Sequence, residues 1–319
     1  MKKNNASLCV LISEGVKSLF CKKREKSKKL LVLESLYVRS EFREEIKYEY
    51  FSLRKGEEIE FLFESKLVGK TDDCLVFADL NLKGGSRYFQ VDFIIVQDDA
   101  ASIYEIKGVT GAHVYGREYF ETDKDYRPDN PLEQLTKCKN RVREIFRRYG
   151  IHLKVEGYVV FMDPGFWLYG MPKLSEFILP GQVDQHIDSI QKSTHCRVKN
   201  PQKIINALYE ASIPEYPYTE YPPYTFAGMR KGLYCKECFS FAVAFIGHDY
   251  CCKKCGFCQP VREGVVDAAR EFQRLFPETK ITTGRIYDWL GGTVDYKRIQ
   301  RTLQESFERH GKTSGTYYR

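Results

Sequence analysis

Six of the eleven cysteines in this 319-residue chain lie between Cys235 and Cys258, and this clustering constrains the fold more than any other feature. Cys235-x-x-Cys238 and Cys252-x-x-Cys255 form two CxxC pairs, separated by thirteen residues. Two such knuckles present four thiolates tetrahedrally, which suits Zn²⁺ in a closed structural site. A disulfide framework would instead distribute its pairs through a short secreted chain. The spacing therefore predicts a zinc site in a reducing compartment.

Two further cysteines leave the ligand set partly open. Cys251 directly precedes Cys252, and Cys255-x-x-Cys258 is itself a CxxC pair, so Cys251 or Cys258 is an alternative ligand. We favour Cys252 with Cys255, because the following Gly256 suits the tight turn of a knuckle. The residues between the two pairs have strand character. This pattern predicts a zinc ribbon that folds around its ion, since it is too small to have a core of its own.

The composition is that of a globular protein without a membrane span. Apolar residues make up 43% and charged residues 29%, which excludes a disordered or fibrous chain. The longest apolar stretch, from Leu8 to Cys21, is interrupted by Glu14 and Lys17, so it is too short and too polar to cross a bilayer. It also lacks a small-residue cleavage site. We therefore expect a cytoplasmic protein of two or more domains, with no membrane partner.

Positive charge is concentrated at the N-terminus. Residues 1–55 carry 14 Lys and Arg against 7 Asp and Glu, a balance of +7 that equals the net charge of the whole chain. The density is greatest from Lys22 to Lys29. Such a run fits contact with a phosphate backbone, and it fits a solvated tail equally well.

Composition also divides the chain into segments. Four prolines and four tyrosines fall within residues 213–224, which disfavours both helix and sheet and predicts an extended connector. A helix is expected from about Leu30 to Tyr48. The five predicted segments are a basic N-terminal arm with this helix (1–50), a mixed α/β domain (51–212), the connector (213–226), the zinc ribbon (227–260) and a helical C-terminal domain (261–319).

The order of elements in residues 51–212 is helix, strand, strand, strand, helix, strand, which indicates an α/β core. The first helix should turn Leu62 and Phe63 inward. Alternation on the second strand should place Val91, Phe93 and Ile95 on one face. The expected elements are a helix from Gly56, strands at Leu75–Leu80, Phe89–Gln97 and Ser102–Val109, a helix from Pro131, and a strand at Val155–Met162.

The most informative chemistry lies in Glu105-Ile106-Lys107. Residues two apart on a strand share a face, so Glu105 and Lys107 should point together while Ile106 points into a core. Asp92 lies 13 positions upstream of Glu105, a separation that a hairpin closes. Paired carboxylates are costly to bury unless a cation neutralises them, and Mg²⁺ prefers oxygen ligands. A lysine beside the ion can orient water and stabilise charge on a phosphate. A surface salt bridge is the alternative explanation.

These residues occur in an order that resembles a known family. The matching motifs are Gly56-Glu57, Tyr88-Phe89-Gln90-Val91-Asp92, Glu105-Ile106-Lys107-Gly108 and Asn130-Pro131-Leu132-Glu133-Gln134. They are similar to the pattern of the nuclease-related domain (NERD), which resembles the PD-(D/E)xK superfamily of metal-dependent nucleases. The resemblance covers about residues 51–165, and some family members also carry a trailing CxxC…CxxC segment. It implies a restriction-endonuclease-like core, in which helices flank a mixed central sheet.

The resemblance also implies which residues form the site. Glu57, Asp92, Glu105 and Lys107 would be the active-site set, with Gln134 in support. Asp92 and Glu105 would hold Mg²⁺ or Mn²⁺, and Glu57 would complete the site directly or through water. Gly108 departs from the pattern, since an Asn commonly follows the lysine.

The implied function is a metal-dependent nuclease acting on nucleic acid, with DNA as the expected substrate. One alternative is a non-catalytic nucleic-acid-binding or regulatory protein with a degenerate nuclease core. Another is a structural adaptor that uses the zinc site and helices for protein contacts. The sequence leaves open RNA as a substrate, endonuclease or exonuclease action, and homo-oligomerisation.

Two helices carry basic residues suited to nucleic acid. On the helix of Gln134, we expect contacts from Lys137, Arg141 and Arg148, although these residues also fit a solvated outer face. Near the C-terminus, a short helix capped by Thr282 or Thr283, a turn at Gly291-Gly292 and a helix from Tyr296 resemble a helix-turn-helix. Its second helix would present Arg298 and Arg301 to phosphates or bases. Three small helices that close a domain are the alternative.

Overall fold

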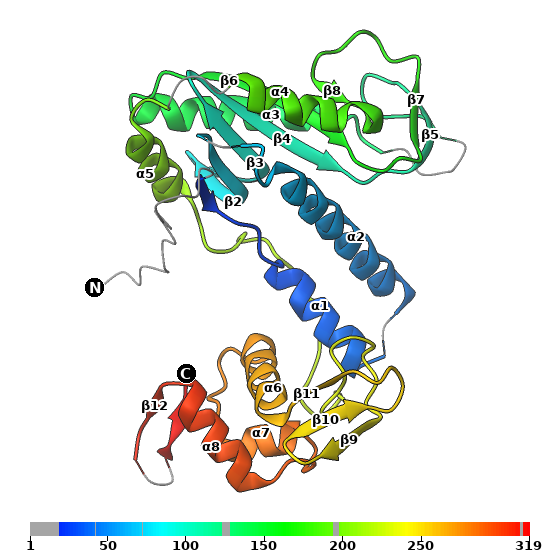
Figure 1. Cartoon of the computed structure of the whole chain (residues 1–319), viewed down its shortest axis with the longest axis vertical. Coiled ribbons are helices and arrows are strands. Elements are labelled where there is room, and N and C mark those ends of the chain that lie inside the picture. Colours follow the sequence, from blue (N-terminus) through cyan, green and yellow to red (C-terminus); the bar gives the residue numbers. More distant parts are fainter. Residues whose placement is uncertain (1–18, 42, 72, 123–127, 194–197, 313–314) are drawn as a thin grey trace. The chain divides into compact units, whose positions relative to one another are not determined.

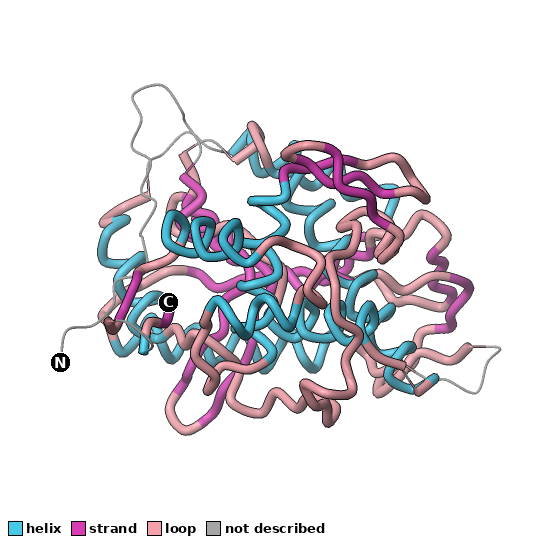
Figure 2. The backbone as a smooth tube through the Cα atoms, turned by 90° about the horizontal axis from the view of Figure 1, so that it is seen from below, coloured by secondary structure: helices cyan, strands magenta, loops and turns pink. Residues whose placement is uncertain are grey.

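The computed structural model describes residues 19–41, 43–71, 73–122, 128–193, 198–312 and 315–319 (Figure 1). The chain separates into two compact units. The described residues up to Glu25 and Ser52–Thr219 form the first, while Lys26–Phe51 and Glu220–Arg319 form the second. Figure 2 shows the helices, strands and loops of the backbone. Residues 1–18 of the predicted basic arm lie outside the described residues, and the five predicted segments stay a prediction.

A six-stranded mixed sheet forms the centre of the first unit, in the order β1-β2-β3-β4-β6-β8. β2, β3 and β4 pair antiparallel, whereas β1, β6 and β8 each add parallel to a neighbour. The four strands predicted from the sequence are confirmed, as is the mixed α/β class. The strands are β1 (Leu19–Lys22), β2 (Leu75–Gly84), β3 (Arg87–Gln97), β4 (Ala100–Lys107), β6 (Lys154–Phe161) and β8 (Phe177–Ile178).

Helices cover both faces of this sheet. Buried residues of α3 and α5 pack in one core cluster, and those of α2 and α4 pack in another. As expected, Pro131 begins α3, and Asn130 caps it by accepting a hydrogen bond from the N–H of Leu132. Among the described residues, no helix combines the length and apolarity needed to cross a membrane. The helices are α2 (Glu44–Leu67), α3 (Pro131–Arg148), α4 (Val183–Ser193, after the 3₁₀ turn η1, Pro180–Gln182) and α5 (Pro201–Ala211).

The predicted helix from Leu30 to Tyr48 is wrong in its extent. One helix, α1 (Lys28–Arg39), ends where the N–H of Ser40 bonds to the Leu36 carbonyl. A second helix, α2, begins before the predicted start at Gly56 and runs through this glycine, which costs only about 1 kcal/mol within a helix. Leu62 is 48% exposed, so its predicted inward direction is also wrong, whereas Phe63 is buried.

The prediction that Val91, Phe93 and Ile95 share a face is wrong as well. Val91 packs in the cluster of α3, but Phe93 and Ile95 pack in the cluster of α2. The alternation shifts at Asp92, and Asp79, which is opposite it on β2, has a φ of 52° in the left-handed region. We attribute the shift to this local distortion. A residue outside the β region changes the face to which the following side chains of β2 point, and the side chains of the paired strand β3 change face with them.

The small helices and strands of the second unit share one core cluster. Its three-stranded sheet has the order β11-β10-β9, and α1 packs against α6. Thr282, rather than Thr283, caps α7 by accepting a hydrogen bond from the N–H of Arg285. The elements after α1 are β9 (Val243–Ile246), β10 (Asp249–Cys252), β11 (Cys258–Pro260), α6 (Val261–Leu275), α7 (Thr283–Trp289), α8 (Tyr296–Ser306), β12 (Arg309–His310) and β13 (Tyr317–Tyr318).

A buried ion pair joins α1 to α6. The Arg39 guanidinium donates to both carboxylate oxygens of Glu271 at 2.7 to 3.0 Å, and the two side chains are only 1% and 6% exposed. Glu271 also accepts from the indole N–H of Trp289 at 3.3 Å, and Arg39 stacks 4.2 Å from the centroid of that ring. Neither charge is left without a partner, as burial requires.

Replacing Glu271 with alanine should destabilise the second unit by about 3–5 kcal/mol, because it leaves the Arg39 charge buried and unpaired. Unfolding in urea, followed by the fluorescence of buried Trp289 in a Trp167→Phe background, measures the loss. The exposed Glu263 on the same helix is the matched control, and Glu263→Ala should change stability by less than about 0.5 kcal/mol. Equal effects of the two substitutions would contradict this prediction.

Candidate active site

Glu105 is the centre of a bonded group on β4. Its side chain is buried, and its Oε1 accepts hydrogen bonds from Lys107 Nζ and Gln134 Nε2, both at 2.7 Å. Lys107 Nζ also lies 3.4 Å from Gln134 Oε1. Ile106 packs on the other side of the sheet, in the core of α2 and α4. The strand therefore places Glu105 and Lys107 on one face, and α3 brings Gln134 to them.

Asp92 lies across from this group on β3. The β3–β4 pairing runs through Phe93 and Tyr104, so the next pair in register is Asp92 and Glu105. Asp92 Oδ2 accepts a hydrogen bond at 2.8 Å from the N–H of Ile106. Burial, followed by the negative charges of Glu105 and Glu60, raises the pKa of Asp92 well above its usual range. The two carboxylates therefore repel each other in a poorly hydrated place.

The same carboxylates also affect the pKa of Lys107. Burial on its own would lower the pKa of the ammonium, since the charged form loses hydration. The carboxylates of Glu105, Asp92 and Glu60 outweigh this effect, so the pKa of Lys107 is raised. Lys107 therefore stays protonated in the site and serves as a cation rather than a base.

Helix α2 contributes two acidic side chains. Glu57 is 3% exposed, as expected for a member of the site, and Glu60 lies one helical turn further on. Burial is the main cause that raises the pKa of Glu60 to about 7, and Asp79, Glu57 and Glu105 add to it. Glu60 was missed from the sequence. The signal was present, because residues three apart on a helix share a face.

The beginning of the chain brings cations to these acids. Arg24 forms an ion pair with Glu60, and Lys22 lies 3.8 Å from a carboxylate oxygen of Asp79. The N–H of Arg24 donates to Glu64 at 3.0 Å. The basic run was interpreted either as a phosphate contact or as a solvated tail. Neither interpretation fits Lys22 and Arg24, because both side chains contact carboxylates of the protein itself. No local pattern could reveal these pairs, because they join residues about 36 or more positions apart.

The donor set fits a hard divalent cation. Glu57, Glu60, Asp92 and Glu105 gather where Lys107 and Arg24 supply the positive charge, and burial together with the charges of Glu105 and Glu60 raises the pKa of Asp92. Both bonds to Glu105 end on Oε1, and the bond to Asp92 ends on Oδ2, so one oxygen of each faces no donor in the described part of the chain. No three carboxylates bring oxygens within 4.8 Å of one another there.

Residues 55–162 match the family model of the nuclease-related domain, NERD. The resemblance predicted from the sequence is confirmed over this segment. All five residues expected in the site, together with Glu60 and Asp79, fall within the NERD segment, whereas Arg24 lies outside it. No curated protein and no solved structure matches the chain.

Gly108, which departs from the NERD pattern, has a packing explanation. A Cβ at this position would lie 2.1 Å from Ile59 Cδ1 on α2. Helix α2 therefore approaches the end of β4 closely, on the same part of the helix that carries Glu57 and Glu60. The missing side chain permits this approach, and it removes none of the residues that contact Glu105.

The basic residues expected to bind nucleic acid differ in their surroundings. On α3, Lys137 is exposed and pairs with Glu133 at 2.6 Å, Arg141 stacks 5.3 Å from the Phe89 ring, and Arg148 is exposed. On α8, Arg298 donates to the carbonyls of Gly247 and His248, and Arg301 is exposed. Arg141 and Arg298 thus serve internal contacts. Nucleic-acid binding by these residues stays a prediction.

The cysteine cluster has the expected members. The sulfurs of Cys235, Cys238, Cys252 and Cys255 all lie within 4.8 Å of one another, a spacing that could hold a zinc ion. Hydrogen bonds from backbone N–H groups, chiefly that of Cys255, lower the pKa of Cys252 to about 6. A thiolate is therefore available to a metal near neutral pH.

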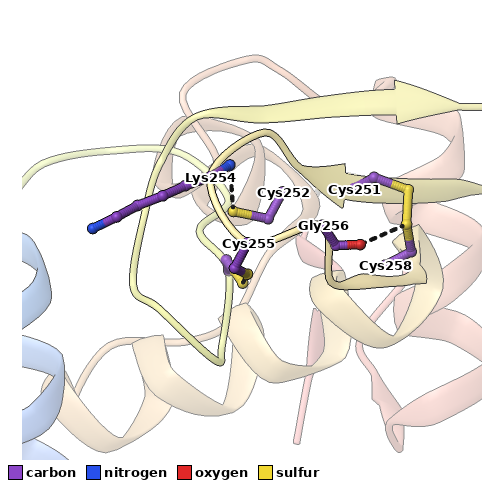
Figure 3. Close-up of a disulfide and its surroundings, with 7 residues drawn as sticks. Cys251, Cys252, Lys254, Cys255, Gly256 and Cys258 are labelled. Carbon is purple, nitrogen blue, oxygen red and sulfur yellow. Dashed lines mark hydrogen bonds between the residues drawn. A yellow bond between two sulfur atoms is a disulfide. The ribbon is translucent and has the colours of Figure 1, made fainter.

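The other two cysteines of the segment form a disulfide, Cys251–Cys258. They are directly opposite on β10 and β11, and alternation places Cys251 on the other side of β10 from Cys252. Figure 3 shows the disulfide directed away from Cys252 and Cys255. Neither Cys251 nor Cys258 replaces a member of the cluster, and the expectation of metal ligands without disulfides is wrong for this pair.

Proposed function

We propose that the NERD segment is a metal-dependent nuclease that hydrolyses phosphodiester bonds, with DNA as the expected substrate. The observation that carries the proposal is the arrangement of Asp92 across from Glu105, with Lys107 and Gln134 bonded to the same Glu105 oxygen. Burying two facing carboxylates lowers stability, and a module that only binds nucleic acid has no use for them.

In this proposal, Asp92 and Glu105 would hold Mg²⁺ or Mn²⁺, and Glu57 would complete the site directly or through water. The bound ion would polarise a phosphoryl oxygen and lower the pKa of a bound water. Lys107 remains protonated, so it donates a hydrogen bond to the attacking water or neutralises charge that develops on the phosphate. Gln134 donates a hydrogen bond to Glu105 Oε1 and thereby fixes the orientation of that carboxylate.

Plasmid DNA incubated with the protein tests the proposal. Cleavage should require Mg²⁺ or Mn²⁺ and should stop in EDTA. Lys107→Ala should lower the rate about 10²- to 10³-fold, by analogy with the removal of one group that stabilises transition-state charge. Lys154→Ala, which removes an exposed lysine at the beginning of neighbouring β6, is the matched control and should stay within about 3-fold.

Two results would count against the proposal. Cleavage that persists in Lys107→Ala at the rate of the control would show that the activity belongs elsewhere. DNA binding by the wild type without cleavage in either metal would support the alternative, a non-catalytic nucleic-acid-binding protein. For the four-cysteine cluster, we propose a structural Zn²⁺ that holds the ribbon.

A further inference from the structure

A small second sheet in the first unit exposes a flat aromatic face. β5 (Gly111–Val114) and β7 (Phe166–Tyr169) pair in parallel, with Ala112 opposite Trp167 and Val114 opposite Tyr169. These four residues are exposed, Trp167 by 63% and Tyr169 by 59%. Exposed aromatic residues on adjacent positions of one sheet face commonly mark a binding surface. We call these four residues the aromatic face.

The opposite side of this sheet is firmly packed. Phe166 stacks on Phe161 with ring centroids 4.2 Å apart, and His113 lies 5.3 Å from Phe166. The N–H of Tyr115 bonds to the Tyr169 carbonyl at 2.8 Å and extends the pairing. The aromatic face is therefore held on a rigid support, so that little ordering would be needed when a ligand binds.

The spacing of the two rings suits nucleic-acid bases. Side chains two residues apart on a strand are separated by about 6.6 Å, roughly twice the 3.4 Å between stacked bases. One base can therefore lie between the rings of Trp167 and Tyr169, or two neighbouring bases can each stack on one ring. None of the four residues of the aromatic face is acidic, and the acidic neighbour that pairs with the face is the exposed Glu121, beside Val114.

The aromatic face is continuous with the candidate active site. The N–H of Met162 bonds to the Lys107 carbonyl, and the N–H of Gly111 bonds to the Gly165 carbonyl. Backbone hydrogen bonds therefore continue from the β4–β6 pair to the β5–β7 pair. Ala112 lies five positions after Lys107, a span of at most about 18 Å. Asp163, which precedes β7, pairs at 3.2 Å with Lys55 on α2, two residues before Glu57.

From this placement we propose that Trp167 and Tyr169 stack unpaired bases, so that the nuclease site takes single-stranded nucleic acid or the single-stranded part of a larger substrate. The proposal rests on the proposed function for its setting. Unpaired bases offer their faces to aromatic side chains, whereas duplex bases cover each other. Trp167 and Tyr169 would thus determine specificity and take no part in bond cleavage.

The two tryptophans of the chain make a direct test possible. Trp167 is 63% exposed, whereas Trp289 is fully buried in the second unit. Titration with a single-stranded oligo(dT) in EDTA, which prevents cleavage, should quench the tryptophan fluorescence, and a duplex of equal length should quench it far less. Trp167→Phe should remove the quenching. Trp167→Ala and Tyr169→Ala should each weaken binding of the single strand about 5- to 150-fold.

Tyr218→Ala is the matched control, because Tyr218 is 69% exposed in the same unit but lies outside the aromatic face. It should leave the affinity unchanged. The absence of quenching, or equal affinities for Trp167→Ala and the wild type, would overturn the proposal, as would self-association that depends on Trp167. Cleavage without quenching would refute only the proposal that Trp167 and Tyr169 stack bases. Quenching without cleavage in Mg²⁺ would refute only the proposal that the NERD segment is a nuclease.

Discussion

Removing the metal that we expect at Cys235, Cys238, Cys252 and Cys255 should unfold the ribbon of β9–β11 while the helices α6–α8 stay packed. The apolar tip of β9 is on the surface, with Phe245 42% and Ile246 62% exposed, and Tyr250 is the one large apolar side chain of these strands that is buried in the core. Structural zinc contributes about 10–16 kcal/mol of apparent binding energy in zinc-finger peptides, and such segments are unfolded without it. The helices keep their own core around buried Phe272 and Trp289.

Cys252→Ser is the variant that tests this prediction. The purified wild type should contain one Zn²⁺ per chain, and the variant should contain none. Limited proteolysis should then cut the variant between residues 235 and 258. A double variant, Cys251→Ser with Cys258→Ser, should keep its zinc, because these two residues pair with each other outside the cluster. Equal zinc content in Cys252→Ser and the wild type would contradict the assignment of the ligands.

The parts of the structure that follow from local pattern could be predicted from the sequence. Alternation along β4 was enough to place Glu105 and Lys107 together, with Ile106 in a core on the other side. Helical spacing and the capping residue Asn130 were enough to begin α3 at Pro131. The two CxxC pairs were enough to predict the cysteine cluster. In each case, neighbours in sequence determine the geometry.

The failures have a different origin, since they depend on contacts between distant segments. Arg24 finds its partner Glu60 only because β1 pairs with β2, and a short strand at one sheet edge has too little pattern to be recognised. The left-handed conformation of Asp79 shifts the alternation of β2 and β3, and nothing in the local sequence requires it. Leu62 has an apolar side chain, yet Glu57 and Glu60 take the inward positions of α2.

Asp92→Asn should abolish cleavage while making the metal-free protein more stable. Asparagine has nearly the same shape, and its carbonyl oxygen can still accept the hydrogen bond from the N–H of Ile106. The lost charge removes one of the two facing carboxylates that we propose as ligands of the ion, so the cleavage rate should fall at least about 10²- to 10³-fold. The fold should not suffer, because Asp92 is partly buried, and this burial together with the charges of Glu105 and Glu60 raises its pKa.

The sign of the stability change follows from the raised pKa of Asp92. A carboxyl whose pKa is higher in the folded than in the unfolded protein stabilises the fold below its unfolded pKa, and this contribution is lost as the pH rises through the folded value. In EDTA at neutral pH, Asp92→Asn should therefore melt at a higher temperature than the wild type, and the difference should shrink as the pH falls toward 4.

In Mg²⁺, the wild type should melt at a higher temperature than Asp92→Asn, the reverse of the order expected in EDTA. A cation that binds only the folded protein raises the melting temperature of the wild type, and it has less to bind in Asp92→Asn. Asp99→Asn, at the exposed turn between β3 and β4, is the matched control and should behave like the wild type in both conditions. A lower melting temperature for Asp92→Asn in EDTA, or an equal Mg²⁺ effect on all three proteins, would show that Asp92 is a structural residue. The combination of higher stability with lost cleavage is expected only if the charge of Asp92 is kept for the ion.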